Sequence, residues 1–269
     1  MASYGADAKL IAGGQSLMPM LNLRLAEPAV LIDINRLSTL AGIRRENGHL
    51  RIGALTRHRE VEISPEVAAL EPMLTRAARE IGHLAIRNRG TIGGSTAHAD
   101  PSAEWPLLAV ALDAQLDLRS RSGTRRVAAR EFFIGPFTTI AERDEILTAV
   151  DFPIAPRGSG FGFQEMCRRP GDFAIVAVAC RVNMSAGKCV GASLAVGGAD
   201  AVPRLIPEIA KPLAGSGGEA DAVREAAKLA RAAVDPSSDL HASAEFRRRI
   251  VEVLSRRALE QAFADASSS

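Results

Sequence analysis

The chain has few cysteines and few aromatic side chains. Its 269 residues include three cysteines, and aromatic residues make up only 4%. Cys167, Cys180 and Cys189 form no CxxC pair and match no zinc or iron–sulfur spacing, so we expect no metal site in this chain. An odd, sparse set of cysteines favours reduced thiols in a cytoplasmic protein. The shortage of aromatic residues argues against a stacking platform for nucleic-acid bases.

The chain also lacks an excess of charge of either sign and lacks long apolar runs. There are 33 basic and 31 acidic residues, giving a formal net charge of +2, so the composition indicates no nucleic-acid partner. No apolar run approaches the roughly 20 residues needed to cross a bilayer, and we expect no transmembrane segment. The first residues, 1–9, lack the apolar core of a signal peptide. We therefore expect a cytoplasmic, globular protein.

The hydrophobic pattern mixes short strands with helices, which predicts an α+β fold. The Pro- and Gly-rich stretch 153–160 is the best candidate for a linker and divides the chain into domains 1–156 and 157–269. The second domain opens with three strand-like runs, at 160–166, 174–183 and 190–196. It ends in two helices, predicted at 220–233 and 243–264, and the second of these has Phe246, Ile250, Val253 and Leu254 on one apolar stripe.

Two Gly-Gly segments are the most informative local feature. Ala12–Ser16 follows a short predicted strand and precedes a predicted helix from Ser16 to Leu25, and Thr91–Ser95 forms a second glycine loop. Glycine lets a ligand approach the backbone closely, and successive free N–H groups can bind an anion. Neither segment is a P-loop or a GxGxxG fingerprint. From the residues alone, each segment is either a phosphate cradle or an ordinary tight turn.

The flanking residues carry a resemblance. The run Ala-Gly-Gly-Gln-Ser-Leu-Met-Pro at 12–19, with Leu-Ile-Asp-Ile at 31–34, resembles the first FAD-binding segment of the medium subunits of aerobic molybdenum hydroxylases. The run from Arg87 to Pro101 is similar to the second segment of that family, and Gly171-Asp172-Phe173-Ala174 resembles a motif that opens its C-terminal domain. The three motifs occur in order and cover nearly the whole chain. Relatives normally begin with a further strand and helix, so either the start of this sequence was assigned late or that element is absent, in which case the first subdomain is smaller.

The resemblance implies a fold and a set of cofactor contacts. The first domain would consist of two small α/β subdomains of the vanillyl-alcohol-oxidase type, followed by a C-terminal domain with a short antiparallel sheet and helices. Both glycine segments would hold the FAD diphosphate through backbone N–H groups, so a bulky side chain at Gly13 or Gly93 should abolish FAD retention while the chain still folds. The expected FAD contacts are Ala12, Gly13, Gly14, Gln15, Ser16, Leu17, Ile81, Thr91, Ile92, Gly93, Gly94, Ser95, His98, Glu104, Leu147 and Gln164.

Individual side chains in that set have alternative interpretations. Glu104 would accept hydrogen bonds from the ribose or adenine side of FAD, or would simply place a charge at the start of a helix. Ile81 would lie near the isoalloxazine ring or belong to the core. Gln164 or Glu165 stands where relatives often have a flavin-contacting lysine, which leaves that contact in doubt. The resemblance implies non-covalent FAD, so His98 is expected to be a contact and not a point of attachment.

The function implied by the resemblance is electron transfer inside a larger enzyme. A large subunit would carry the molybdenum cofactor and oxidise substrate, and a small subunit would carry two [2Fe-2S] clusters. Electrons would pass through FAD in this chain to an external acceptor, and the assembly would be a dimer of heterotrimers. No catalytic residue is then expected here. The alternatives are a self-sufficient FAD-dependent oxidoreductase, which would turn over substrate alone, and a scaffold protein that no longer binds FAD.

Overall fold

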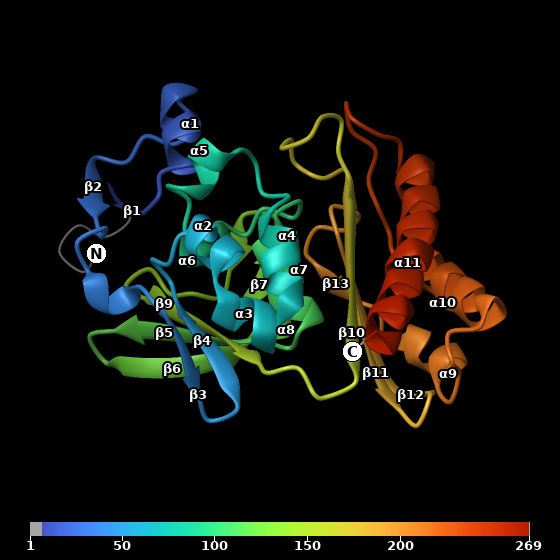
Figure 1. Ribbon diagram of the computed structural model, residues 1–269. Coiled ribbons are helices and arrows are strands. Elements are labelled where there is room, and N and C mark those ends of the chain that lie inside the picture. The colour runs from blue at the N-terminus through green and yellow to red at the C-terminus, as the bar shows by residue number, and fades with distance from the viewer. Residues whose placement is uncertain (1–6, 269) are drawn as a thin grey trace.

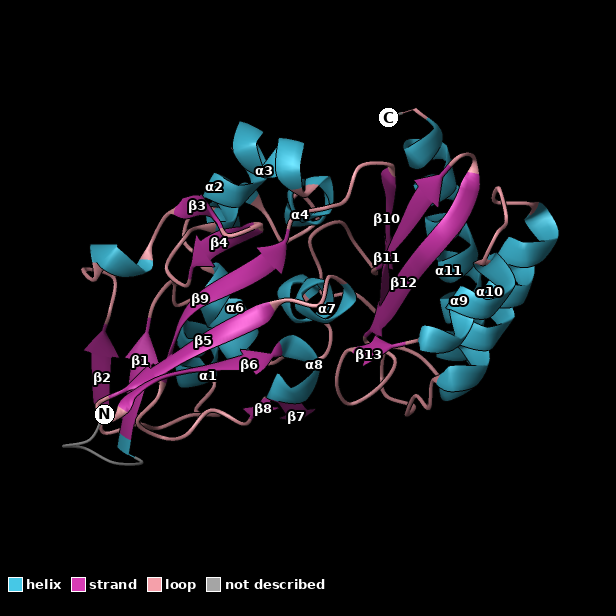
Figure 2. Ribbon diagram, turned by 90° about the horizontal axis from the view of Figure 1, so that it is seen from below, coloured by secondary structure: helices cyan, strands magenta, loops and turns pink. Residues whose placement is uncertain are grey.

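The computed structural model describes residues 7–268 and confirms the predicted α+β class (Figure 1). The first part of the chain forms a unit in which helices cover a five-stranded sheet. The second part forms a four-stranded sheet covered by helices (Figure 2). Among the described helices none is both long and apolar enough to cross a membrane.

The chain starts with a two-stranded parallel sheet. β1 (Ala8–Ile11) pairs with β2 (Val30–Asp33), and α1 (Leu17–Asn22) lies between them in sequence. Both strands agree with the pattern, but the predicted helix from Ser16 to Leu25 was too long. It ends because Arg24 takes a left-handed conformation, with φ of 54°, and none of the residues of α1 is buried. The apolar side chains of this helix therefore do not belong to the core.

The five-stranded antiparallel sheet has the order β3-β4-β9-β5-β6. It consists of two hairpins, β3 (Ile43–Glu46) with β4 (His49–Gly53) and β5 (Gln115–Ser120) with β6 (Gly123–Ala128), joined by the central β9 (Ile146–Pro153). The Asn47-Gly48 turn, a pair typical of tight hairpins, closes the first hairpin, and both of its residues have positive φ. β9 thus brings the end of the first domain back into the middle of the sheet.

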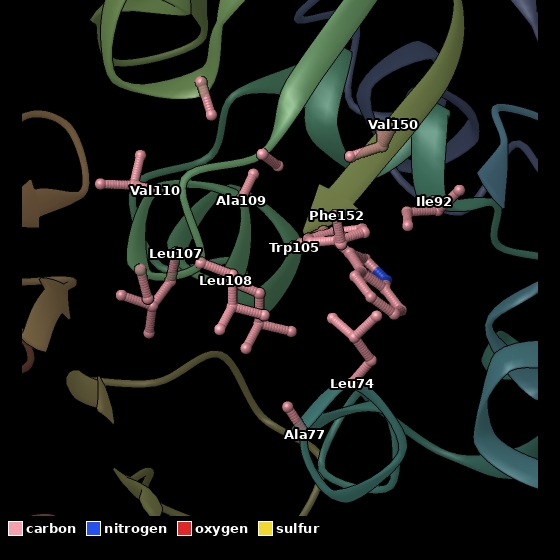
Figure 3. Close-up of a cluster of buried hydrophobic side chains, with 14 of the residues drawn as sticks. Leu74, Ala77, Ile92, Trp105, Leu107, Leu108, Ala109, Val110, Val150 and Phe152 are labelled. Carbon is pink, nitrogen blue, oxygen red and sulfur yellow. The ribbon is translucent and has the colours of Figure 1, made fainter. Parts of the chain in front are cut away.

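Short helices lie on one side of this sheet. They are α2 (His58–Ile63), α3 (Pro65–Leu70), α4 (Pro72–Ala78), α5 (Leu84–Arg87), α6 (Ile92–His98) and α7 (Glu104–Ala111). Of these, α6 packs directly against β4 and β9. Figure 3 shows Leu74 of α4, Ile92 of α6 and Trp105 of α7 converging with Phe152 of β9, and all four side chains are fully buried. Every residue of α7 is buried, so this helix is the centre of the first domain's core.

A short segment follows the second hairpin before the chain enters the second domain. It contains α8 (Ala129–Phe132), β7 (Phe133–Gly135) and the two-residue β8 (Thr138–Thr139). The second sheet has the order β10-β11-β12-β13 and is antiparallel, with β10 (Ser159–Met166), β11 (Val176–Ser185), β12 (Lys188–Gly197) and β13 (Arg204–Leu205). The helices α9 (Ala210–Leu213), α10 (Ala220–Ala233) and α11 (Ala244–Ser267) follow.

Helix α11 lies against β10 and β11, and glycine permits the close approach. A Cβ at Gly160 or Gly162 would overlap the backbone of α11 at Ala262 or Ala258. The predicted apolar stripe of this helix was wrong in part, because Phe246 and Val253 are 38% and 36% exposed. Arg247 is instead 6% exposed and donates to the carbonyl oxygens of Ile175 and Gly198, so a buried arginine satisfies backbone acceptors beside the sheet.

Candidate cofactor-binding site

One cavity of about 790 Å³ lies where the β1–β2 unit meets α6, α7 and a loop of the second domain. Its wall includes every residue that we predicted as an FAD contact except Ile92 and Gln164. The tertiary structure therefore brings the two glycine segments together, although they are far apart in the sequence. The volume falls within the range of about 300–1,000 Å³ that is usual for small-molecule and cofactor pockets.

The first glycine segment presents a row of backbone donors to this cavity. Within residues 7–268, no acceptor in the chain is recorded for the N–H groups of the five residues from Ala12 to Ser16. Gly14 has φ of +75°, a conformation that favours glycine. The Gln15 side chain donates to the carbonyl oxygen of Gly13 at 2.9 Å and closes the turn. Consecutive N–H groups of this kind suit the oxygens of a diphosphate.

The second glycine segment is not a loop. Thr91 is the N-cap of α6 and accepts from the N–H of Gly94 at 3.1 Å, so the Gly-Gly pair lies in the first turn of a helix. The N–H groups of Ile92, Gly93 and Ser95 donate to the carbonyl oxygens of Thr56, Ala54 and Thr91. The prediction that Thr91–Ser95 wraps a diphosphate with its N–H groups was therefore wrong, because the N–H groups of residues 92–95 already donate to acceptors within the chain. Thr91, Gly93, Gly94 and Ser95 all line the cavity, and Gly94 is the most exposed of them.

The first glycine of each pair serves the packing of the chain on itself. A Cβ at Gly13 would overlap the carbonyl oxygen of Arg89, and a Cβ at Gly93 would overlap Ala54. Both residues are buried, whereas Gly94 is exposed and Gly14 is half-buried. The expectation that a bulky residue at Gly13 or Gly93 leaves the fold intact is corrected by this geometry, because Gly13 would be forced away from Arg89 and Gly93 away from Ala54.

Apolar and ionisable side chains complete the wall. Ile81 and Leu147 are 8% and 7% exposed and line the cavity, so Ile81 is a core residue with one side toward the cavity. Glu104 is 6% exposed, and burial raises its pKa to about 7. Burial also lowers the pKa of His98, whose ring lies 5.1 Å from that of Phe137. Near neutral pH the His98 ring is therefore uncharged, whereas Lys9, Glu142, Arg143, Glu145 and Asp172 give the wall charged side chains of both signs.

Two predicted contacts lie elsewhere. Ile92 belongs to the hydrophobic core and is fully buried, because the first turn of α6 directs it toward the sheet. Gln164, on β10, donates to the side-chain oxygen of Gln261 on α11 at 3.0 Å and does not line the cavity. Neighbouring Glu165 does not line it either, and burial raises the pKa of that carboxyl to about 8.

Sequence reasoning missed part of the wall. Gly171, Asp172 and Phe173 come from the second domain and close one side of the cavity, and the Phe173 side chain is 63% exposed. The motif containing them had been noted only as the start of the C-terminal domain. Gly171 has φ of +88° and lies against His83, so the glycine marks a close approach between domains. Phe137 and Leu55 were also missed, since nothing local distinguishes them from core residues.

The wall fits an extended nucleotide cofactor. A row of backbone donors suits a diphosphate, apolar side chains suit flat rings, and one buried carboxyl can bond to polar groups. Among residues 7–268 no group of three or more His, Cys, Asp or Glu side chains is arranged to hold a metal ion.

Comparison with known proteins agrees with this geometry. Residues 1–155 match the family model of the FAD binding domain in molybdopterin dehydrogenase, and residues 161–262 match that of the CO dehydrogenase flavoprotein C-terminal domain. The chain is 40% identical over 263 residues to the 6-hydroxypseudooxynicotine dehydrogenase complex subunit alpha of Paenarthrobacter nicotinovorans, covering 97% of this chain and 89% of that protein. It is 37% identical to the carbon monoxide dehydrogenase medium chain of Afipia carboxidovorans, covering 100% and 93%.

Solved structures show the same similarity. A chain of the Cu,Mo-CO dehydrogenase in its cyanide-inactivated form superposes with a TM-score of 0.95 at 37% identity, covering 98% of this chain and 92% of the other. A chain of quinoline 2-oxidoreductase from Pseudomonas putida 86 superposes with a TM-score of 0.93 at 36% identity, covering 97% and 90%.

Proposed function

This chain belongs to the FAD-binding medium subunits of the molybdenum hydroxylases, and on that premise we propose that its 790 Å³ cavity holds FAD for electron transfer between partner subunits and an external acceptor. The observation that supports the proposal best is the row of N–H groups from Ala12 to Ser16, which have no acceptor recorded within the described chain and lie on the cavity wall. When bound, the flavin supplies the redox chemistry, exchanging electrons singly or in pairs.

The residues of this chain bind and orient the cofactor. The N–H groups of Ala12–Ser16 donate to the diphosphate, and the backbone of Gly94 allows close approach from the opposite side. Ile81 and Leu147 exclude water from the flat rings. Glu104, with its pKa near 7, offers an acceptor or a donor according to pH. His98 and Phe137 form a second wall through their ring contact. All of these roles, and the remaining contacts predicted from the sequence, belong to the proposal.

The proposal extends to partners. Two relatives are named as a complex subunit and as a medium chain, which supports assembly with other subunits. We infer a large subunit with a molybdenum cofactor and a small subunit with [2Fe-2S] clusters, arranged as a dimer of heterotrimers in the cytoplasm. The three cysteines of this chain are free thiols, which supports a reducing compartment. We place the boundary between the FAD-binding and C-terminal domains at residues 156 and 157.

Reconstitution of the full chain with FAD tests the proposal. The cofactor should bind with quenching of flavin fluorescence, and FAD at one hundred times its Kd should stabilise the fold by about 2.7 kcal/mol. Purification of the chain with its partners should give the absorption of flavin and iron–sulfur clusters together. A folded chain that neither retains nor binds FAD would contradict the proposal. Turnover of an organic substrate by the chain alone would favour a self-sufficient oxidoreductase.

A further inference from the structure

The first glycine segment, Ala12–Ser16, follows β1 in a part of the chain that makes little apolar contact with the core. Among the described strands, β1 and β2 pair only with each other. The main hydrophobic cluster of the first domain contains no residue before Leu50, and Ala8 and Ile34, although buried, lie outside it. Something other than the core must therefore fix the position of Ala12–Ser16 relative to the second segment.

A chain of side-chain hydrogen bonds makes that connection. Asn35, just after β2, donates through Nδ2 to the carbonyl oxygen of Ala12 at 2.8 Å and to Asp33 Oδ1 at 2.7 Å. Its Oδ1 accepts from Nη2 of Arg57 at 2.8 Å. Nη1 of Arg57 in turn donates to the carbonyl oxygen of Arg89, which directly precedes Gly90 and the second segment. We call these bonds between Asn35 and Arg57, with their ends at Ala12 and Arg89, the Asn35–Arg57 clamp.

The chemistry of the partners fixes the orientation of the amide. A guanidinium has donors only, so the Asn35 atom that faces Arg57 must be the oxygen. The nitrogen then faces Ala12 and Asp33, which offer acceptors only. Both amide donors and one acceptor position of Asn35 are used, and Asp33 also accepts from the backbone N–H of Asn35 at 2.9 Å. The amide therefore cannot rotate without breaking several bonds at once.

The other end of the clamp is fixed to the second segment through the backbone. Arg57 is the N-cap of α2 and forms an isolated antiparallel bridge with Thr91. On either side of this bridge, His58 N–H donates to Gly90 and Ile92 N–H donates to Thr56, each at 3.0 Å. The side chain of Arg57 thus extends from a backbone that moves with Thr91 and reaches the unit that carries Ala12.

We propose that Asn35 and Arg57 are positioning residues that hold the two glycine segments in register and so determine how tightly the diphosphate of FAD is bound. The proposal rests on the proposed function. Ala12 uses its carbonyl oxygen in the clamp, which leaves the N–H groups that follow it to face the cavity. The contact of Gly13 with Arg89 sets how close the segments can come, and the clamp prevents them from separating.

The experiment compares FAD affinity with the stability of the full chain without cofactor. Asn35→Ala and Arg57→Ala should each raise the Kd for FAD about tenfold, because the first removes three side-chain hydrogen bonds and the second removes two. Because both residues act in one chain of bonds, the double variant should lose little more than either single variant. Arg36→Ala is the matched control. It removes an exposed neighbouring cation whose side chain makes no hydrogen bond or ion pair within residues 7–268 and acts on Asp33 only through its charge, and its Kd should stay within about twofold of wild type.

Two further measurements separate positioning from general support of the fold. Amide hydrogen exchange without cofactor should speed up in residues 8–16 of the clamp variants and stay unchanged in α4 and α7. The ³¹P resonances of bound FAD should shift in both clamp variants and not in Arg36→Ala. Unchanged Kd values in the clamp variants would overturn the proposal. A rise in Kd accompanied by faster exchange throughout the first domain would also overturn it, since the role would then be structural. Both results leave the proposed function standing, whereas failure of the wild-type chain to bind FAD would remove both.

Discussion

Trp105 donates through its indole N–H to Nδ1 of His58 at 2.9 Å, deep in the first domain. Because Nδ1 accepts, the proton of the neutral imidazole must lie on Nε2, which faces Gly90. Burial, together with the charges of Arg57 and Arg87, lowers the pKa of His58 to about 3, so the ring stays neutral. This bond connects the central helix α7 to the start of α2, beside the cofactor cavity.

Replacing Trp105 with phenylalanine should therefore cost stability. The Trp105→Phe variant leaves Nδ1 of a buried histidine without a donor, which costs about 1–3 kcal/mol beyond the loss of packing. Urea unfolding followed by circular dichroism measures this loss. A second change, His58→Leu, removes the acceptor as well, so the double variant should lose less than the sum of the two single variants. Additive losses would contradict the importance of the hydrogen bond.

Substitutions in the two glycine pairs should weaken different properties, the stability of the fold at Gly93 and the affinity for FAD at Gly14. Gly93→Ala adds a methyl group that would overlap Ala54, and it should lower the free energy of unfolding of the chain without cofactor by about 1–3 kcal/mol. Gly14→Ala meets only the flexible side chains of Met18 and Ile11, and its left-handed φ costs about 1–2 kcal/mol locally. FAD affinity should therefore fall more than global stability in Gly14→Ala, and the reverse should hold in Gly93→Ala. Thermal melts with and without FAD distinguish the two, and equal behaviour would contradict this division of roles.

The binding of FAD should weaken as pH rises through 7. Burial raises the pKa of Glu104 to about 7, and its nearest charged neighbours, Asp100 and Glu80, are also acidic. A bound diphosphate raises this pKa further, so binding takes up protons, and the Kd should increase up to about tenfold per additional pKa unit between pH 6 and 8. Glu104→Gln should remove this dependence. Titration calorimetry in buffers of different ionisation enthalpy measures the proton uptake directly, and identical pH profiles for both proteins would refute the prediction.

Buried Glu71 should make the stability of the fold depend on pH, independently of the cofactor. It is fully buried at the start of α4, and neither carboxyl oxygen has a hydrogen-bond partner in the described structure. Burial raises its pKa to about 8, although Nη1 of Arg181 lies 3.6 Å away. The folded state then holds a proton that the unfolded state loses near pH 4.5. The contribution of Glu71 to the free energy of unfolding should be fully present below pH 4.5. Between pH 4.5 and 8 this free energy should fall by at most about 1.4 kcal/mol per pH unit.

The variant Glu71→Gln isolates this contribution. Glu104 and Glu165 also have raised pKa values, so the slope of wild type alone cannot be assigned to one residue. Denaturant unfolding of both proteins at intervals from pH 4.5 to 8 gives the difference. The wild type should lose stability relative to Glu71→Gln as pH rises, and parallel curves would contradict a protonated Glu71.

Local sequence determined most of the secondary structure. Helix α10 lies at the predicted residues 220–233, and the turns at Asn47-Gly48 and Ala186-Gly187 close hairpins with positive φ. These features depend on periodicity and on turn residues, which act within a few positions of the chain. Thr56, which precedes Arg57 at the start of α2, bonds through its side chain to the backbone of Gly42 and does not cap that helix. Arg57 is the N-cap because the bridge to Thr91 fixes the start of α2.

The sequence by itself determined which two glycine segments matter, and it left each of them as either a phosphate cradle or an ordinary tight turn. Only the tertiary structure decided what each glycine does. All four glycines line the cavity, but Gly13 and Gly93 are buried and permit close contact with Arg89 and Ala54, whereas Gly14 and Gly94 are more exposed, and the second segment is the first turn of a helix. The reason is physical, because a glycine has the same local freedom wherever it occurs, and only the atoms that fold against it show which neighbour needs the space.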